Sequence, residues 1–172
     1  MSLFPEYDPE PTYHKAAEIS DCGNYRYRLE RRWSARPLLS YIMLNPSTAD
    51  GNADDPTIRR CMGFARREGA GGIVVGNLYA FRATNPRVLL LASDPVGPEN
   101  LQAIRRIAAD AMQTGMPIVA AWGAGMNGAA VWVMNVIRDS GATVKCLGVT
   151  ADGSPRHPLY VKSAQPLEPW PV

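Results

Sequence analysis

The sequence has 172 residues, of which 46% are hydrophobic and 20% are charged, the composition of one globular domain with a sizeable core. Its formal net charge of +2 is far smaller than that of many nucleic-acid enzymes and argues against a large electrostatic footprint on DNA. No apolar run approaches the roughly 20 residues that a transmembrane helix needs, so no membrane association is expected.

The basic residues are mostly arginines. Lys15, Lys145 and Lys162 are the only lysines, and the other 15 of the 18 basic residues are arginines. The planar guanidinium suits phosphate and base recognition, although a GC-rich genome produces the same bias, so both interpretations stay open.

The start of the chain and the cysteines indicate a cytoplasmic protein. Residues 1–6 lack the basic region and apolar core of a signal peptide. Cys22, Cys61 and Cys146 are far apart, without disulfide or metal-ligand spacing, as is typical of reduced thiols. We expect a cytoplasmic monomer.

The N-terminal part predicts an arm followed by a hairpin. Residues 1–11 contain three prolines and three acidic residues and are expected to form a flexible arm. Within a hairpin extension over residues 12–36, the turn residues 21–24 separate strands at 17–20 and 25–32. In the second strand Tyr25, Tyr27 and Leu29 alternate with Arg26 and Arg28, which predicts a half-buried strand with one basic face.

From residue 38 onward, strands and helices alternate. Buried strands are predicted at 38–44, 73–78, 116–122 and 143–148, and helices at 56–68, 98–113 and 129–140. Right-handed crossovers then give an α/β fold, a three-layer αβα sandwich with a central four-stranded, mainly parallel sheet plus the N-terminal hairpin. Residues 1–172 are expected to form one domain.

Polar residues follow the predicted strands. Asn45, Asn77, Gly123 and the loop of His157 all come after carboxyl ends of strands, so we expect them at one rim, where open α/β sheets bind ligands. Each residue also has a structural explanation: Asn45 as a turn residue, Asn77 as a partner for backbone groups, and Asp55 as a helix cap. Their convergence is what indicates a site.

Other chemistries have weaker signals. Asp50, Asp54 and Asp55 form a cluster of oxygen ligands without a supporting histidine, and no metal or cofactor is expected. Residues 69–76 lie before and within a strand, which is the wrong context for a phosphate-binding glycine loop. Ser47 lacks the Gly-x-Ser-x-Gly elbow of a hydrolase nucleophile.

Several longer motifs resemble an uncharacterised bacterial and phage family, number sixteen forty-three among the domains of unknown function. They lie at residues 22–29, 43–50, 54–61, 77–84, 94–100, 121–123 and 155–160 and cover nearly the whole chain. This resemblance implies no activity by itself.

A more distant resemblance is to the uracil-DNA glycosylase superfamily. There the first strand ends in Gly-x-Asn-Pro or Gly-x-Asp-Pro, a middle strand ends in a base-reading asparagine, a later strand ends in Trp-Gly, and a His-Pro loop closes the site. The matching segments occur here in the same order, as Asn45-Pro46, Asn77-Leu78, Trp122-Gly123 and His157-Pro158-Leu159. The resemblance implies a uracil-DNA-glycosylase-like fold.

It also implies a DNA glycosylase-like hydrolase that flips a base and cleaves its N-glycosidic bond. Asn45 or Asp50 would position or activate water, and His157 would stabilise the departing base anion. Asn77 would grip the base edge, with Tyr79 or Phe81 as a stacking platform and Leu159 as a wedge into the duplex. Further implied contacts are to the base from Pro46, Ser47, Trp122 and Gly123, and to DNA from Thr48, Arg82, Arg156 and Pro158.

Alternatives remain for the substrate and for the activity. Met43 stands where the superfamily has its first glycine, and the small Ser47 leaves room for a larger base, so a modified or damaged base is as open as uracil. The chain is alternatively a hydrolase or transferase of free nucleotides or nucleosides, with a metal on Asp50, Asp54 and Asp55. A catalytically silent module that binds DNA or a modified base is the third interpretation.

Overall fold

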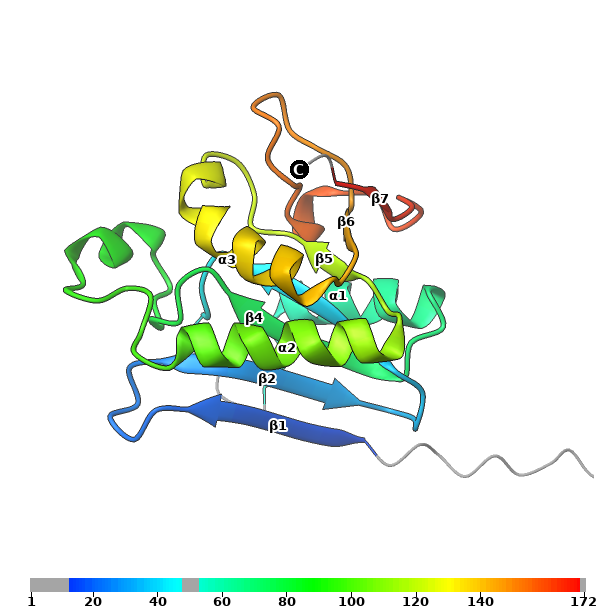
Figure 1. Ribbon diagram of the computed structural model, residues 1–172, viewed down its shortest axis with the longest axis horizontal. Helices are drawn as coiled ribbons and strands as arrows, with labels where there is room; N and C mark the ends of the chain where they lie inside the picture. The colour runs from blue at the N-terminus through cyan, green and yellow to red at the C-terminus, as the bar shows by residue number, and fades with distance from the viewer. Residues whose placement is uncertain (1–12, 48–52, 171–172) are drawn as a thin grey trace, which may run out of the picture.

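The computed structural model describes residues 13–47 and 53–170, which form an α/β fold with a mixed seven-stranded sheet and three α-helices (Figure 1). The strands are β1 (His14–Ile19), β2 (Arg26–Arg32), β3 (Leu38–Met43), β4 (Gly72–Asn77), β5 (Ile118–Ala120), β6 (Val144–Cys146) and β7 (Glu168–Pro169). The helices are α1 (Pro56–Arg67), α2 (Asn100–Thr114) and α3 (Asn127–Ser140), with short 3₁₀ turns at Pro86–Leu91 and Pro158–Tyr160.

The sheet is larger than the predicted one. Its order is β1-β2-β4-β3-β5-β6-β7, and β4, β3, β5 and β6 are the four predicted parallel strands. The expected four-stranded sheet is nevertheless wrong in extent, because β2 pairs antiparallel along β4 and makes the hairpin part of the same sheet. β7 pairs antiparallel with β6. It has only two residues, one of them a proline, so no sequence pattern predicts it as a strand.

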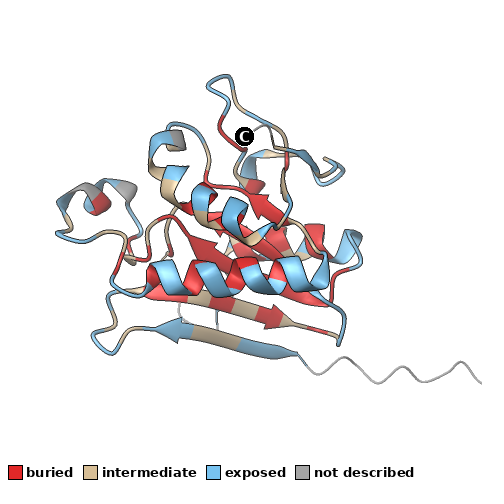
Figure 2. Ribbon diagram, viewed as in Figure 1, coloured by how far each residue is buried: buried red, intermediate tan, exposed pale blue. Residues whose placement is uncertain are grey.

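Helices cover both faces of the sheet, giving the three expected layers. Ile58, Cys61 and Phe64 of α1 pack with Tyr41 of β3 on one face. On the other face α2 and α3 pack against Ile42, Ile118 and Ala120. Figure 2 shows the buried central strands between the helices and the more exposed β1 at the edge. Among the described helices, none is long and apolar enough to cross a bilayer.

The start of α1 follows the predicted capping. Asp55 is the N-cap, its Oδ1 accepts the Ile58 backbone N–H at 2.8 Å, and Pro56 occupies the first turn. Because this cap precedes the buried stripe of α1, it fixes where the helix begins and keeps the Asp55 carboxylate at the carboxyl-end rim of the sheet.

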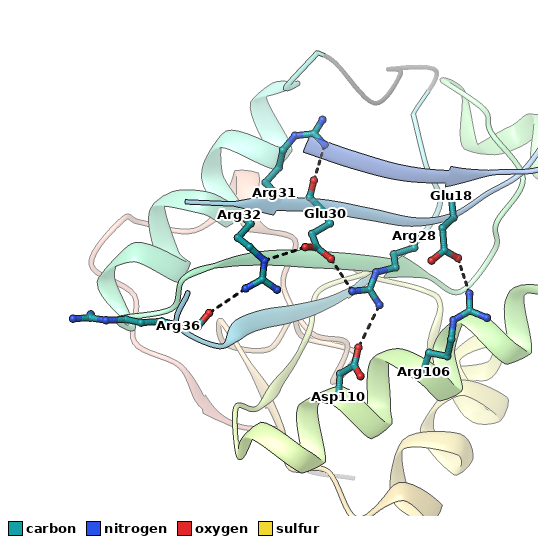
Figure 3. Close-up of polar contacts among 8 residues, drawn as sticks. All are labelled: Glu18, Arg28, Glu30, Arg31, Arg32, Arg36, Arg106 and Asp110. Carbon is teal, nitrogen blue, oxygen red and sulfur yellow. Dashed lines mark hydrogen bonds and ion pairs between the residues drawn. The ribbon is translucent and has the colours of Figure 1, made fainter. Parts of the chain in front are cut away.

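The predicted basic face of β2 is only partly correct. Arg26 and Tyr27 are consecutive and both buried, so the alternation fails at the start of the strand. Further along, Arg28 donates to Glu30 at 2.8 Å and to Asp110 of α2 at 3.4 Å, and Arg32 donates to Glu30 at 3.2 Å (Figure 3). These charges tie α2 to the hairpin and do not form a bare cationic surface.

Two glycines provide a matched test of the close contact between β2 and β4. A Cβ on Gly72 would lie 2.3 Å from the backbone oxygen of Arg31 and 2.9 Å from the Cα of Arg32, whereas a Cβ on the exposed Gly63 would meet nothing within 4 Å. Because backbone cannot yield as a side-chain tip does, Gly72→Ala should lower the free energy of unfolding by about 2–3 kcal/mol.

Gly63→Ala, in the interior of α1, should instead raise the free energy of unfolding by about 0.5–1 kcal/mol through helix propensity. Urea denaturation of both variants checks this prediction. Equal stabilities of the two variants would contradict the close approach of β4 to β2.

Candidate active site

A cavity of about 410 Å³ lies where β3, β4 and β5 end, within the range typical of small-molecule sites. Seven residues singled out from the sequence line it: Asn45, Ser47, Asn77, Trp122, Gly123, Arg156 and His157. The sequence did not single out five other polar or aromatic lining residues for a substrate site: Arg26, Asp55, Thr57, Thr150 and Tyr160. The apolar lining includes Met43, Leu44, Ile58 and Val75.

The parallel register brings these residues together. Met43 of β3 is level with Asn77 of β4, and Ile42 is level with Ala120 of β5. The pairing continues past the strand ends, since the N–H of Leu78 donates to Met43 at 2.9 Å and the N–H of Ala121 donates to Ile42 at 2.9 Å. The residues that follow the three strands therefore leave the sheet side by side.

Asn45 has a structural role that limits its chemistry. Its Nδ2 donates to the carbonyl oxygens of Pro46 at 3.0 Å and Ala83 at 2.8 Å, which joins the loop after β3 to the loop after β4. Pro46 also accepts the N–H of Ala83 at 3.1 Å. With its amide nitrogen engaged, Asn45 offers its Oδ1 to a ligand, and an oxygen there can accept a hydrogen bond from water.

Asn77 has the opposite character. It is 2% exposed, it lines the cavity, and its Nδ2 has no acceptor among the described residues. The backbone beneath it is held by Asn100, whose Nδ2 donates to the carbonyl oxygens of Asn77 at 3.0 Å and Leu78 at 3.3 Å. A buried donor in this position is ready to meet an acceptor on a ligand.

His157 is held as a neutral donor. Its Nδ1 accepts the N–H of Leu159 at 3.3 Å, so in the neutral ring the proton sits on Nε2. Burial lowers the pKa of His157 below the ordinary 6.5, and the nearby carboxylate of Asp55 opposes that shift. At neutral pH the imidazole can therefore donate a hydrogen bond from Nε2.

The loop that carries His157 is fixed by Asp152. The Asp152 carboxylate accepts the N–H of Gly125 at 2.8 Å and the Ser154 hydroxyl at 3.0 Å. Hydrogen bonds from Thr150, Gly125 and Ser154 hold the pKa of Asp152 well below its usual range. The N–H of Gly123 also donates to Pro155 at 3.0 Å, so the exit loop of β5 and the histidine loop form one wall.

The carboxylates before α1 have separate partners. Asp54 accepts from Arg31 at 2.7 Å and pairs with Lys15 at 3.4 Å, whereas Asp55 caps α1 and accepts the Ser47 hydroxyl at 3.0 Å. Asp50 lies outside the described residues. Within the described ranges, no group of three or more His, Cys, Asp or Glu residues is placed to hold a metal ion.

Arg26 is the main residue that sequence reasoning missed. It is 4% exposed, lines the cavity, and stays cationic at neutral pH although burial lowers its pKa to about 10, with the charge of Asp55 opposing the shift. Its position in an apparently alternating strand predicted an outward-facing side chain, so no sequence signal distinguished it from Arg28.

Some predicted residues are not part of the cavity lining. Phe81 packs edge-on against Tyr25 with ring centroids 5.7 Å apart, and Tyr79 packs against the apolar cluster under α2 and α3. Arg82 donates to the Gly23 carbonyl at 2.9 Å. Pro46 and Pro158 are buried beside the cavity and Leu159 is exposed, whereas Thr48 lies outside the described residues. Trp122 and Tyr160 are the aromatic lining residues.

Arginines of α1 hold the C-terminal segment. Arg60 donates to Val161 and Pro158 backbone oxygens and to the Ser163 hydroxyl, the last at 2.8 Å. Arg67 donates to the Ser163 carbonyl at 2.8 Å. These contacts hold the 3₁₀ turn that carries Leu159 and Tyr160.

The chain belongs to the family described as Protein of unknown function (DUF1643), which matches residues 26–159. The matched segment contains every described cavity-lining residue named above except Tyr160. No curated protein matches the chain.

Among solved structures, the chain has a weak similarity to carboxyl esterase 2 (TmelEST2) from the mycorrhizal fungus Tuber melanosporum. The identity is 14%, the TM-score is 0.26, and the alignment covers 81% of this chain and 57% of the esterase chain. The chain thus spans little more than half of the esterase's length, and a TM-score this low carries no argument about fold or activity.

An NMR titration of the two histidines tests the electrostatics of the cavity. We expect the pKa of His157 to lie below 6.5, because burial disfavours the imidazolium. The same shift makes the folded state lose stability as the pH falls below 6.5, because the unfolded chain then binds the proton more readily. Asp55→Asn removes the opposing charge, keeps a good N-cap, and should lower the pKa further.

In that titration, His157→Gln identifies the signal by its loss and leaves the signal of His14. A His157 pKa at or above 6.5, or a rise in the Asp55→Asn variant, would contradict the described burial and charge.

Proposed function

We propose that this protein is an N-glycosidic hydrolase that takes a base flipped out of DNA into the cavity at the ends of β3, β4 and β5. The observation that carries the proposal is the lining of this one cavity: an asparagine whose buried amide nitrogen has no acceptor among the described residues, a neutral imidazole and an aromatic wall. An aromatic wall favours a flat ring, and the amide favours a polar ring edge.

The resemblance to the uracil-DNA glycosylase superfamily supports this proposal. Its four short motifs are far apart in the sequence, yet Asn45, Asn77, Trp122 and His157 all line the same cavity. Any residues that follow the carboxyl ends of these parallel strands would meet at one rim, so the support comes from the kinds of side chain that meet there, and a fold-level likeness alone would not imply an activity.

In the proposed reaction, water attacks the sugar carbon, the carbon–nitrogen bond breaks, and the bonding electron pair leaves with the base. The Nε2–H of His157 stabilises the negative charge on the departing base. The Oδ1 of Asn45 accepts a hydrogen bond from the attacking water. The Asp55 carboxylate, oriented by Ser47, favours the positive charge that develops on the sugar. The water proton finally reaches the base, so no other reactant is needed.

Among the described residues, the rim of the cavity offers few phosphate contacts but has exposed apolar side chains. Leu159 is 39% exposed and Tyr160 is 78% exposed, and Arg156 is exposed beside them. In the proposal, Leu159 or Tyr160 enters the space left by the flipped base. Because Arg60 and Arg67 are engaged with the C-terminal segment, we expect moderate DNA affinity with a shallow salt dependence.

The second candidate function is hydrolysis of a free nucleoside or nucleotide. The observation that favours it is the buried cation Arg26 in the cavity lining, combined with the engagement of α1 arginines elsewhere. A small ligand would need the cavity alone and no extended cationic surface. A silent base-binding module would share the same lining without turnover.

The test is formation of abasic sites in oligonucleotides that carry uracil, hypoxanthine or other modified bases. His157→Gln and Asn77→Ala should each lower the rate by at least about 100-fold, because each removes a group that acts on the base. Arg105→Ala, on the exposed face of α2, serves as a matched control and should leave the rate unchanged.

The same preparations distinguish the alternatives. Release of bases from free nucleosides but not from DNA would favour the second candidate. Salt-dependent DNA binding without abasic sites for any base would leave only the binding module.

A further inference from the structure

A small hollow lies on the outer face of α1, around Gly63. Its volume is about 160 Å³, and it is lined by Arg59, Arg60, Gly63, Phe64, Arg67 and Ser163. A Cβ on the exposed Gly63 would meet nothing within 4 Å, so the helix leaves open space between the arginines one turn before and one turn after it. The hollow is smaller than the roughly 300–1,000 Å³ of pockets for whole small molecules, so it suits a single charged group of a larger ligand.

Two of the arginines are held close together by neutral partners that they share. The Cζ of Arg60 lies 5.0 Å and the Cζ of Arg67 lies 5.1 Å from the centroid of the Phe64 ring. Arg60 also donates to the hydroxyl of Ser163 at 2.8 Å, and Arg67 donates to the carbonyl oxygen of Ser163 at 2.8 Å. Two guanidinium groups placed on one ring and one serine repel each other, and an anion bound beside both would offset that repulsion.

The positive charge of the hollow is only partly compensated. Arg60 donates to backbone oxygens and a hydroxyl, which are neutral, so these bonds hold its side chain without cancelling its charge. Arg59 is exposed and has no partner among the described residues. Arg67 pairs with the carboxylate of Glu68 at 2.9 Å. Three guanidinium groups against one carboxylate leave an excess of positive charge.

The polar groups of the hollow are donors. The Ser163 hydroxyl oxygen accepts from Arg60, so its own proton remains available to a ligand. A guanidinium has N–H groups and no acceptor, and its planar fork matches the oxygens of a phosphate. The hollow therefore fits an anionic group with several oxygens.

The hollow is continuous with the rim of the candidate active site. Thr57 and Ile58, in the first turn of α1, line the large cavity, and Arg59 and Arg60 follow them directly. At 1.5 Å per residue, Gly63 lies about 7.5 Å along the helix axis from Ile58. That distance is about two base steps of a DNA strand at roughly 3.4 Å each.

We infer that the hollow around Gly63 binds a backbone phosphate of the DNA strand whose base enters the cavity, about two nucleotides from the flipped one. The inference rests on the proposed function in that DNA is the partner. It makes Arg59 a DNA-binding residue and gives the missing side chain of Gly63 a purpose. A single phosphate contact also agrees with a shallow salt dependence.

Fluorescence anisotropy of a labelled DNA duplex tests the inference. Gly63→Glu fills the hollow with a carboxylate and should weaken binding at least about tenfold at low salt. The control Gln102→Glu adds the same charge to the exposed face of α2, on the opposite side of the sheet, and should stay within about twofold of the wild type. Equal affinities of the two variants, both folded by urea denaturation, would overturn the inference.

The salt dependence of binding assigns the effect to a phosphate. Gly63→Leu fills the hollow without a charge, and the slope of log K against log salt concentration should become shallower by about 0.9. Arg59→Gln should weaken binding severalfold, whereas Arg105→Gln on α2 should not. An unchanged slope in Gly63→Leu, or equal effects of the two arginine substitutions, would contradict a phosphate contact at this place.

Inorganic phosphate tests the other source of the same anion. If the wild-type protein binds inorganic phosphate, loses that binding in Gly63→Glu, and binds no DNA at low salt, the hollow serves a free phosphate compound and the inference fails.

Turnover separates the inference from the proposed hydrolysis, because the hollow lies outside the cavity where the bond breaks. In the abasic-site assay, Gly63→Glu should raise the DNA concentration at half-maximal rate and leave the maximal rate unchanged, whereas His157→Gln lowers the maximal rate. A protein that binds DNA through the hollow without forming abasic sites retains the inference and loses hydrolysis. Abasic-site formation with wild-type DNA affinity in Gly63→Glu retains hydrolysis and loses the inference.

Discussion

The parallel register of β3 with β4 and β5 is the constraint on which the candidate site depends. It sets Met43 level with Asn77 and Ile42 level with Ala120, and the pairing extends beyond the strands through Leu78 and Ala121. In a strand, a slip of one residue turns every side chain to the opposite face. Such a slip in β4 would move the Asn77 amide out of the cavity. Gly76 opposes it, because a Cβ at its position would lie 2.8 Å from the side-chain tips of Ile104 and Ile107.

Much of the fold follows from the sequence because its signals are local. The cap at Asp55 with Pro56 sets the start of α1, and the near-continuous apolar character of residues 38–43 and 72–77 indicates strands covered on both faces. Parallel strands require crossovers, and crossovers put all carboxyl ends at one rim. The grouping of Asn45, Asn77 and His157 at one cavity follows from that topology without any knowledge of side-chain contacts.

The parts that escaped prediction depend on nonlocal contacts. Arg26 is buried where the start of β2 meets the loop after β4, with its backbone N–H donating to Ala80, and the sequence of the hairpin does not reveal that contact. The expected basic face of β2 was incomplete because its charges have partners from elsewhere in the chain. Glu30 and Asp110 pair with Arg28, and backbone carbonyls of the C-terminal segment accept from Arg60 and Arg67. Strand periodicity predicts which face of the sheet a residue occupies, but not which residues of other elements it contacts there.

Two kinds of polar group line the cavity: those with hydrogen-bond partners in the described structure and those without. Asn45 and Asp55 bond within the rim, through Ala83, Ser47 and Ile58, so their rigidity comes from the fold. The donors of Asn77 and Trp122 lack acceptors among the described residues, and an unmet buried donor destabilises a protein by about 1–3 kcal/mol. A fold that retains two such donors beside a buried guanidinium is suited to a ligand that meets them. The polarity of this wall therefore favours acceptor-bearing rings more strongly than the motifs alone do.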